Sequence, residues 1–159
     1  MKKIIASVLA LSLLAAVSTT AFAAEINQDS DPKTSEAKIT TSIAPTYTVS
    51  IPEDTSVAFN ATETQFGSIE ITQAQIDPNM QIKVSLDSEN DALINQTDNT
   101  KTITYTVNDE NGVFTSGTYL AAGDKTDLTI NISQEDWNKA YAGSYEDTVI
   151  FTVSYEAIG

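Results

Sequence analysis

The sequence contains no cysteine, no histidine and no arginine among its 159 residues. Without cysteine the chain can form no disulfide, and without cysteine and histidine it lacks the ligands that zinc sites prefer. The same absences exclude a cysteine nucleophile, a serine activated by histidine, and a lipid anchor attached through a thiol. We therefore expect a fold that depends on its hydrophobic core alone.

Positive charge is also scarce, because 8 lysines face 22 acidic residues and the net charge is −14. Binding to phosphate needs clustered cations, so this composition predicts no nucleic-acid partner and no attraction to anionic lipid. The six glycines are scattered and form no phosphate-binding loop. The acidic residues are expected to form a solvated surface that keeps the protein soluble.

The one long hydrophobic run lies at the N-terminus. "MKK" is followed by the apolar stretch "IIASVLALSLLAAV" and then by the small residues of "AFA". This layout predicts a bacterial secretory signal peptide over residues 1–23, cleaved after Ala23. The run is shorter than a typical membrane-spanning helix, and no stop-transfer charges follow it. We therefore expect an extracellular protein that leaves the membrane after cleavage.

The remaining sequence divides into two parts. Residues 24–36 are polar, with almost no apolar side chain, which predicts a flexible N-terminal tail. From residue 37 onward the pattern changes to alternating apolar and polar residues, without a further linker or an internal repeat. We expect residues 37–159 to form one domain.

The alternation has a period of two, which indicates half-buried strands. Turn-forming residues separate the runs, as in "DPN", "NDENG" and "AAGDK". This pattern predicts an all-β fold, a single immunoglobulin-like or pilin-like β-sandwich of seven or eight mostly antiparallel strands. The expected strands are residues 37–43, 47–51, 57–59, 67–71, 81–86, 102–107, 127–132 and 145–156.

One short helix is expected near residues 134–140. In "SQEDWNKA", Ser133 is a suitable N-cap and Asp136 follows three residues later. We expect Trp137, the only tryptophan, to pack over one end of the core. The alternative is a ligand-stacking surface made by Tyr119, Trp137 and Tyr141, although the spacing of the last two suits helical packing equally well.

Acidic residues also raise the question of calcium. In "DSEND", Asp87, Glu89 and Asp91 stand at every second position, as at the start of a calcium-binding loop. The sixth position is Ala92 and the twelfth is Asp98, where such a loop needs glycine and glutamate. A solvated turn is therefore the preferred interpretation, and calcium is the only cofactor we consider.

Two segments carry a resemblance to known proteins. "AGSYEDTVIFTVSYE", with Gly143, Tyr145, Asp147 and Thr148, resembles the final strand of bacterial fimbrial and spore-coat-U-like β-sandwich subunits. "YTVSIPEDTSVAF" followed by "FGSIEI" resembles the opening of small secreted surface proteins of gut Gram-positive bacteria. The resemblance implies an extracellular, non-enzymatic role in surface structure or attachment. Many periplasmic pilins carry a disulfide, which this chain lacks.

Fimbrial subunits often assemble by strand donation, in which an extended segment of one subunit adds to the sheet of the next. The candidate donor is residues 37–43, with Ala37, Ile39 and Ile43 as the side chains that would enter the neighbouring core. The preferred interpretation is that this run is the first strand of its own sheet, because most alternating runs pair within their own domain.

Three functions follow as hypotheses. The first is a secreted structural or adhesive protein of the cell surface, with the fibre subunit as one form of it; its partner would be another copy, another surface protein or a glycan of the host or cell envelope. The second is a carbohydrate- or ligand-binding module. The third is a hydrolase that uses paired carboxylates, which we do not favour because no cleft-forming insertion is visible. We expect no enzymatic activity.

Overall fold

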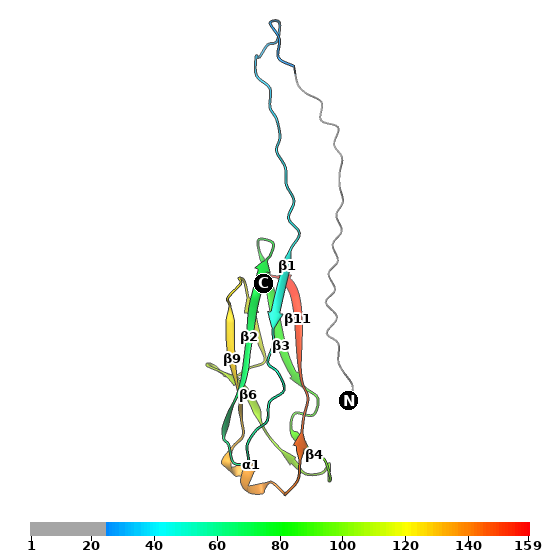
Figure 1. Ribbon diagram of the computed structural model, residues 1–159, viewed down its shortest axis with the longest axis vertical. Helices are drawn as coiled ribbons and strands as arrows, with labels where there is room; N and C mark the ends of the chain where they lie inside the picture. The colour runs from blue at the N-terminus through cyan, green and yellow to red at the C-terminus, as the bar shows by residue number, and fades with distance from the viewer. Residues whose placement is uncertain (1–24) are drawn as a thin grey trace. The chain divides into compact units, whose positions relative to one another are not determined.

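The computed structural model describes residues 25–159, so the predicted signal peptide lies outside the described residues (Figure 1). The chain divides by its internal contacts into two units, Met1–Thr41 and Ser42–Gly159. In the first unit, residues 25–41 form neither helix nor strand. The second unit is a β-sandwich. Strands account for 44% of the described residues and helix for 4%, so the predicted all-β fold with one short helix is confirmed.

The first layer of the sandwich is a five-stranded antiparallel sheet in the order β1-β2-β9-β6-β7. Its strands are β1 (Thr46–Ser50), β2 (Glu63–Gln75), β9 (Lys125–Asn131), β6 (Thr106–Asp109) and β7 (Gly112–Val113). The pairing of β2 with β9 shifts register at Gly67, whose φ of 126° is available to glycine at little steric cost. This bulge bends the long strand β2 along the sandwich.

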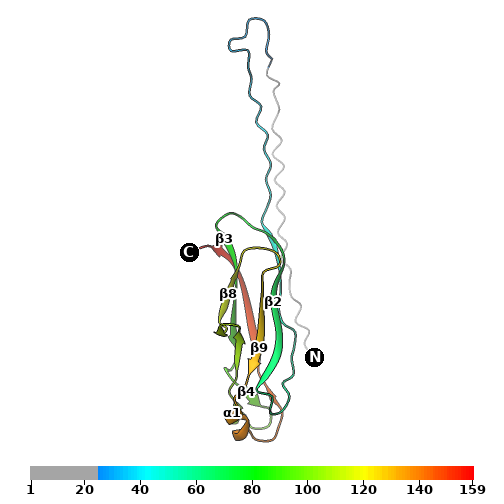
Figure 2. The same cartoon turned by 90° about the vertical axis from the view of Figure 1, so that its left-hand side faces the viewer.

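The second layer consists of two three-stranded sheets in line. The upper one has the order β11-β3-β8 and the lower one β10-β4-β5. Their strands are β11 (Val149–Ala157), β3 (Met80–Ser88), β8 (Ser116–Tyr119), β10 (Tyr145–Glu146), β4 (Leu93–Asn95) and β5 (Thr102–Ile103). Only residues 147–148 separate β10 from β11, and residues 89–92 separate β3 from β4, so the lower sheet continues the upper one past a break. Figure 2 shows β3 and β8 facing β2 and β9.

The main core lies between the two layers. Alternate residues of each strand point inward, and the side chains of Ile69, Ile71, Ile82, Val84 and Leu128 are completely buried. Val107, Phe114 and Tyr119 complete this cluster. The half-buried strands predicted from the alternation are therefore confirmed for β2, β3 and β9.

A second, smaller core fills the end of the sandwich where helix α1 (Gln134–Lys139) lies. The Ser133 hydroxyl accepts the Asp136 N–H at 3.0 Å, so the predicted N-cap is confirmed. Trp137 is buried against Ile103, Ile130 and Ile132, and its indole N–H donates to the Ala61 carbonyl at 2.8 Å. Trp137 thus covers the end of the core, as the preferred interpretation expected.

The expectation that residues 37–43 form the first strand of their own sheet is wrong. No residue from 25 to 45 belongs to a strand. The register gives the reason, because Thr46 of β1 pairs with Gln75, the last residue of β2. Residues before Thr46 therefore have no part of β2 opposite them, and Pro45 has no N–H to extend the ladder.

Other strand boundaries also differ from the prediction. Residues 57–59 are not a strand, because the connection from β1 to β2 packs Pro52 against Gly67 and then turns at Ala58, whose carbonyl accepts the Ala61 N–H. The expected strand over residues 102–107 is divided between the layers as β5 and β6. The final strand is divided into β10 and β11, and the short strands β4, β7 and β8 were not predicted.

The core assignment predicts a large loss of stability for Leu128→Ala, because this substitution leaves a cavity at a fully buried position of β9. We expect the free energy of unfolding to fall by about 2–5 kcal/mol, measured by urea denaturation with Trp137 fluorescence. Leu120→Ala is the matched control, since this side chain is 55% exposed. A similar loss in both variants would contradict the described core.

Candidate functional site

Strand β11 leaves one side of its main chain open. Among the described residues it pairs only with β3. At the two ends of this pairing the Glu89 N–H donates to the Thr148 carbonyl, and the Ile158 N–H donates to the Asn79 carbonyl, both at 2.9 Å. Bonded and non-bonded pairs alternate in an antiparallel ladder. The residues whose N–H and C=O groups point away from β3 are therefore Val149, Phe151, Val153 and Tyr155.

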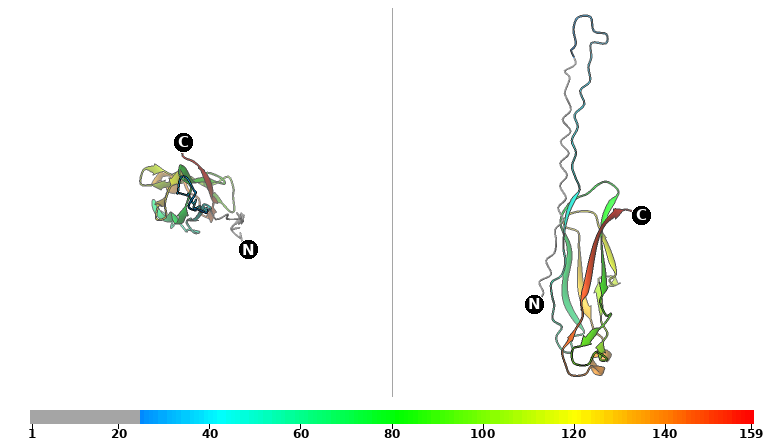
Figure 3. Two further views of the ribbon diagram at one scale, coloured as in Figure 1. Left: turned by 90° about the horizontal axis from the view of Figure 1, so that it is seen from above. Right: turned by 90° about the vertical axis from the view of Figure 1, so that its right-hand side faces the viewer.

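The side chains along this open edge are only partly covered. In the right-hand view of Figure 3, β11 runs along the near side of the sandwich in orange and red. The Tyr47 and Tyr155 ring centroids lie 5.8 Å apart, and those of Phe66 and Phe151 lie 6.0 Å apart, which brings the edges of the two layers together. More than a third of the surface of three apolar side chains stays exposed here, on Tyr47, Ile51 and Val153.

The candidate donor residues stand outside every strand. Ile39 is 96% exposed and Ile43 is 63% exposed, and Ala37 is exposed as well. A run that alternates apolar and polar side chains is normally half-buried in a sheet. Here this run contributes nothing to the core of its own chain, which makes it available to pair elsewhere.

Asp147 organises the break between β10 and β11. Its carboxylate accepts hydrogen bonds from the Ser88 hydroxyl at 2.6 Å, the Tyr105 hydroxyl at 2.8 Å and the Asn90 side-chain amide at 2.9 Å. The N–H groups of Asn90 and Thr148 donate to it as well. The carboxylate thereby joins the β3–β4 connection and the point where residues 102–109 change layers to the start of β11.

The hydrogen bonds around Asp147 decide its protonation. Burial alone would raise its pKa, but donation from Ser88, Asn90 and Tyr105 outweighs that cost and holds the pKa below its ordinary value. Burial raises the pKa of Tyr105 to about 12, and the charge of Asp147 adds to this rise. At neutral pH the site is thus an ionised carboxylate facing a neutral phenol.

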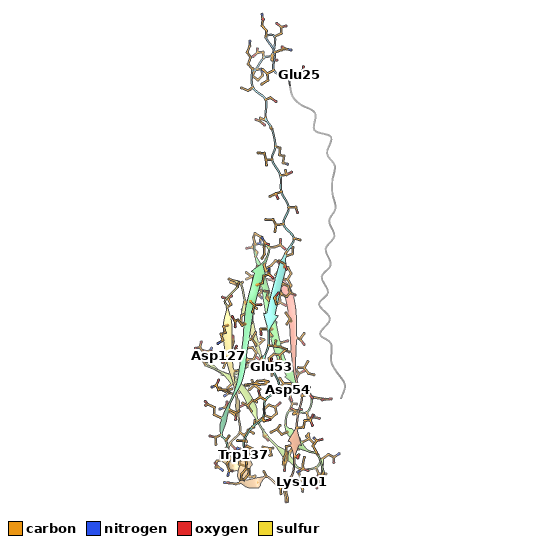
Figure 4. All side chains as sticks on the ribbon, in the orientation of Figure 1. Glu25, Glu53, Asp54, Lys101, Asp127 and Trp137 are labelled. Carbon is orange, nitrogen blue, oxygen red and sulfur yellow. The ribbon has the colours of Figure 1, made fainter. Side chains whose placement is uncertain are left out.

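A pocket of about 700 Å³ lies at the α1 end of the sandwich. Its lining comes from residues 55–59, from residues 140–147, and from Leu93, Ile103 and Trp137. The volume falls in the range of small-molecule sites. Figure 4 labels Trp137 and, at the same end, Lys101.

Two exposed aromatic rings border this pocket. Phe59 is 76% exposed and lies edge-on to Trp137, with ring centroids 5.6 Å apart. Tyr141 is 62% exposed, and the Tyr145 hydroxyl fixes its main chain by accepting its N–H at 3.1 Å and donating to its carbonyl at 2.9 Å. The Lys101 ammonium lies 4.7 Å from the Tyr141 ring centroid. The Phe59 ring is therefore held by Trp137, and Tyr141 is held by Tyr145 and Lys101.

The three candidate stacking residues do not form one surface. Tyr119 is only 3% exposed, belongs to the main core, and bonds through its hydroxyl to Thr126 at 2.9 Å. Trp137 is only 8% exposed and closes the second core. Of the three, Tyr141 alone presents its ring to solvent. Phe59, predicted to lie in a short strand over residues 57–59, lies on the other side of the pocket.

The candidate calcium ligands do not come together as a group. Across residues 25–159 no three acidic side chains are placed to hold a metal ion. The main chain of this segment is used in the turn instead, since the Glu89 N–H donates to Thr148 and the Asp91 N–H donates to the Ser88 hydroxyl at 2.7 Å. Asp87 accepts the Ser88 N–H at 2.9 Å.

No protein-family model matches the chain, and no curated protein is significantly similar to it. Within the described part of the chain, no helix has both the length and the apolar character needed to cross a membrane.

The Asp147 network predicts a pH-dependent loss of stability in Asp147→Asn. The folded pKa is lowered, so the carboxylate stabilises the fold fully above its unfolded pKa and loses this effect as the pH falls through the folded value. We expect the variant to lose about 1–3 kcal/mol of unfolding free energy at pH 7, because an amide cannot accept all these donors. The difference from wild type should shrink below about pH 4.

Urea denaturation at pH 7 and at pH 3 measures both effects. Asp127→Asn is the control, since this exposed carboxylate only pairs with Lys125 on the surface. A constant difference between wild type and Asp147→Asn over this pH range would refute the role of the charged form.

Proposed function

We propose that the protein is an exported, non-enzymatic surface protein with a structural or adhesive role, and that its copies join by strand donation. The observation that carries the proposal is that one chain contains both an unpaired extended segment and a strand with an open edge. Residues 37–43 carry Ala37, Ile39 and Ile43 on one side, together with Thr41, and expose both isoleucines. Strand β11 offers an open main-chain edge beside exposed apolar residues.

The alternation of side chains in β11 and in residues 37–43 supports pairing between these two segments. On β11, the residues whose N–H and C=O groups face the open edge are the same ones whose side chains point toward the other layer, such as Phe151 and Val153. Residues directly opposite each other in an antiparallel pair place their side chains on one face. A donor strand bonded there would thus direct Ile39 and Ile43 into the sandwich and leave Thr40 and Ser42 outside.

The energetics favour occupation of the edge. Fully burying an isoleucine side chain contributes about 1.5–3 kcal/mol, and each added main-chain hydrogen bond contributes about 0.5–1.5 kcal/mol. The donor must be ordered on binding, which opposes these gains. Burial of two isoleucines, together with the covering of Val153 and Tyr47, contributes favourable free energy that opposes the entropy cost of ordering the donor.

Donation from one copy to the next is a head-to-tail contact. Such heterologous interfaces generate open filaments when the rotation between subunits does not close a ring. The resemblance of the final strand to fimbrial and spore-coat-U-like subunits agrees with this assembly, and the predicted signal peptide agrees with an extracellular location. The proposal requires no disulfide, metal or bound cofactor.

The donor is tested by Ile39→Asp with Ile43→Asp in the chain that begins at residue 24. Wild-type protein is expected to form concentration-dependent oligomers in size-exclusion chromatography with light scattering, and the double variant is expected to remain monomeric. Thr40→Asp with Ser42→Asp is the control, with the same added charge on the outward face. Wild-type protein that is monomeric at every concentration, or a control that loses assembly equally, contradicts strand donation.

The acceptor is tested by Val153→Pro. Proline removes an N–H that points to the open edge and not to β3, so the fold should remain while strand addition is blocked. This variant keeps its donor, and the Ile39→Asp/Ile43→Asp variant keeps its acceptor. Each alone is expected to be monomeric, and their mixture is expected to give one-to-one dimers that do not grow further. Absence of that dimer, with both variants folded, would place the contact elsewhere.

A further inference from the structure

The pocket at the α1 end has features that strand donation does not require. It lies beyond the break in the second layer, and its walls come from residues 55–59 and 140–147 and from the second core. Large apolar side chains are normally covered, and isolated exposed ones need no explanation. Here two exposed aromatic rings, Phe59 and Tyr141, stand at one 700 Å³ pocket.

We propose that this pocket binds an uncharged oligosaccharide, with Phe59 and Tyr141 as the rings on which sugar faces stack. The site is independent of the proposed strand donation. It would give the protein a binding activity at the end of the sandwich opposite the start of β1, where Figure 1 shows α1.

The two rings are held in place before any ligand binds. Trp137 contacts the Phe59 ring and anchors the same loop through its hydrogen bond to Ala61. Tyr145 bonds twice to the main chain of Tyr141. Gly143 lies two residues after Tyr141, and a side chain there would collide with the amide nitrogen of the buried Asn95. Such preorganisation lowers the entropy cost of binding.

The charges at the pocket favour a neutral ligand. Glu146 and Asp147 are among the lining residues, and the net charge of −14 repels anionic ligands. Lys101 lies over the Tyr141 ring, so its charge repels a second cation from that ring. An uncharged ligand is repelled neither by the acidic residues nor by Lys101.

Polar groups in the lining distinguish a sugar from a purely apolar ligand. The lining includes the polar residues Ser56 and Glu146 as well as the apolar residues Val57, Leu93 and Ile103. Covering such groups with a lipid chain would remove them from water without a hydrogen bond. A sugar ring has an apolar face for the aromatic residues and hydroxyls for the polar groups, and thus matches both kinds of lining.

The test uses the exported chain that carries Ile39→Asp and Ile43→Asp, so that assembly does not affect binding. A glycan array of neutral and sialylated oligosaccharides identifies the ligand, and titration of that glycan with Trp137 fluorescence gives the Kd. Phe59→Ala and Tyr141→Ala are each expected to weaken binding about tenfold or more. Both side chains are exposed, so both variants should fold. Leu120→Ala, which changes an exposed apolar residue outside the pocket, should bind like its parent.

Restored affinity in Phe59→Trp and Tyr141→Phe would support stacking further. The proposal is overturned if the folded protein binds no neutral glycan, if the two alanine variants bind as tightly as the parent, or if sialylated glycans, tetramethylammonium or an apolar peptide bind in preference. None of these results bears on assembly, and loss of assembly in the donor and acceptor experiments leaves this binding test unchanged.

Discussion

The ionised Asp147 carboxylate is the point on which the arrangement of the second layer depends. It takes donors from the end of β3 and the β3–β4 connection, from Tyr105, and from Thr148 within the break. On one side of it β10 and the residues before it line the end pocket, and on the other side β11 begins its open edge. A carboxylate is suited to this role because it accepts several hydrogen bonds at once and needs no proton of its own.

The absence of cysteine makes the hydrogen bonds to Asp147 more important for the stability of the fold. A sandwich without disulfides must be stabilised by burial and hydrogen bonding, and the fully buried side chains are concentrated in the middle of the layers, on β2, β3 and β9. The side of the sandwich at β1 and β11 contributes less, because Tyr47, Ile51 and Val153 remain partly exposed. In the proposed assembly the missing part of the core is supplied by a second copy, so that folding is completed by association.

The sequence predicted what local pattern controls. Alternation gave the fold class, the inward faces of β2, β3 and β9, and the capped helix with a buried Trp137, because each of these depends on near neighbours in the chain. It could not give which strands lie at an edge, since that depends on pairing between distant segments. For the same reason it placed residues 37–43 in a sheet, where the end of β2 at Gln75 leaves them no partner.

The site residues also differ in how far the sequence could predict them. Asp147 left a signal in the sequence, as a charged residue that interrupts the alternation of the final strand. Four of its five donors, however, come from two distant segments, residues 88–90 and Tyr105. Phe59 left no usable signal, because "VAF" is equally compatible with a short strand. Its exposure is decided by a turn at Ala58 and by the position of Trp137, which is 78 residues later in the chain.

An open edge beside exposed apolar side chains is a hazard for any protein, because such edges pair with whatever strand they meet. The high negative charge reduces this hazard, since copies that approach without a specific fit repel one another. Repulsion of this kind is overcome only where many short-range contacts form together. An acidic surface and a complementary donor strand therefore act in the same direction, as they suppress indiscriminate pairing and leave the matched contact as the favourable one.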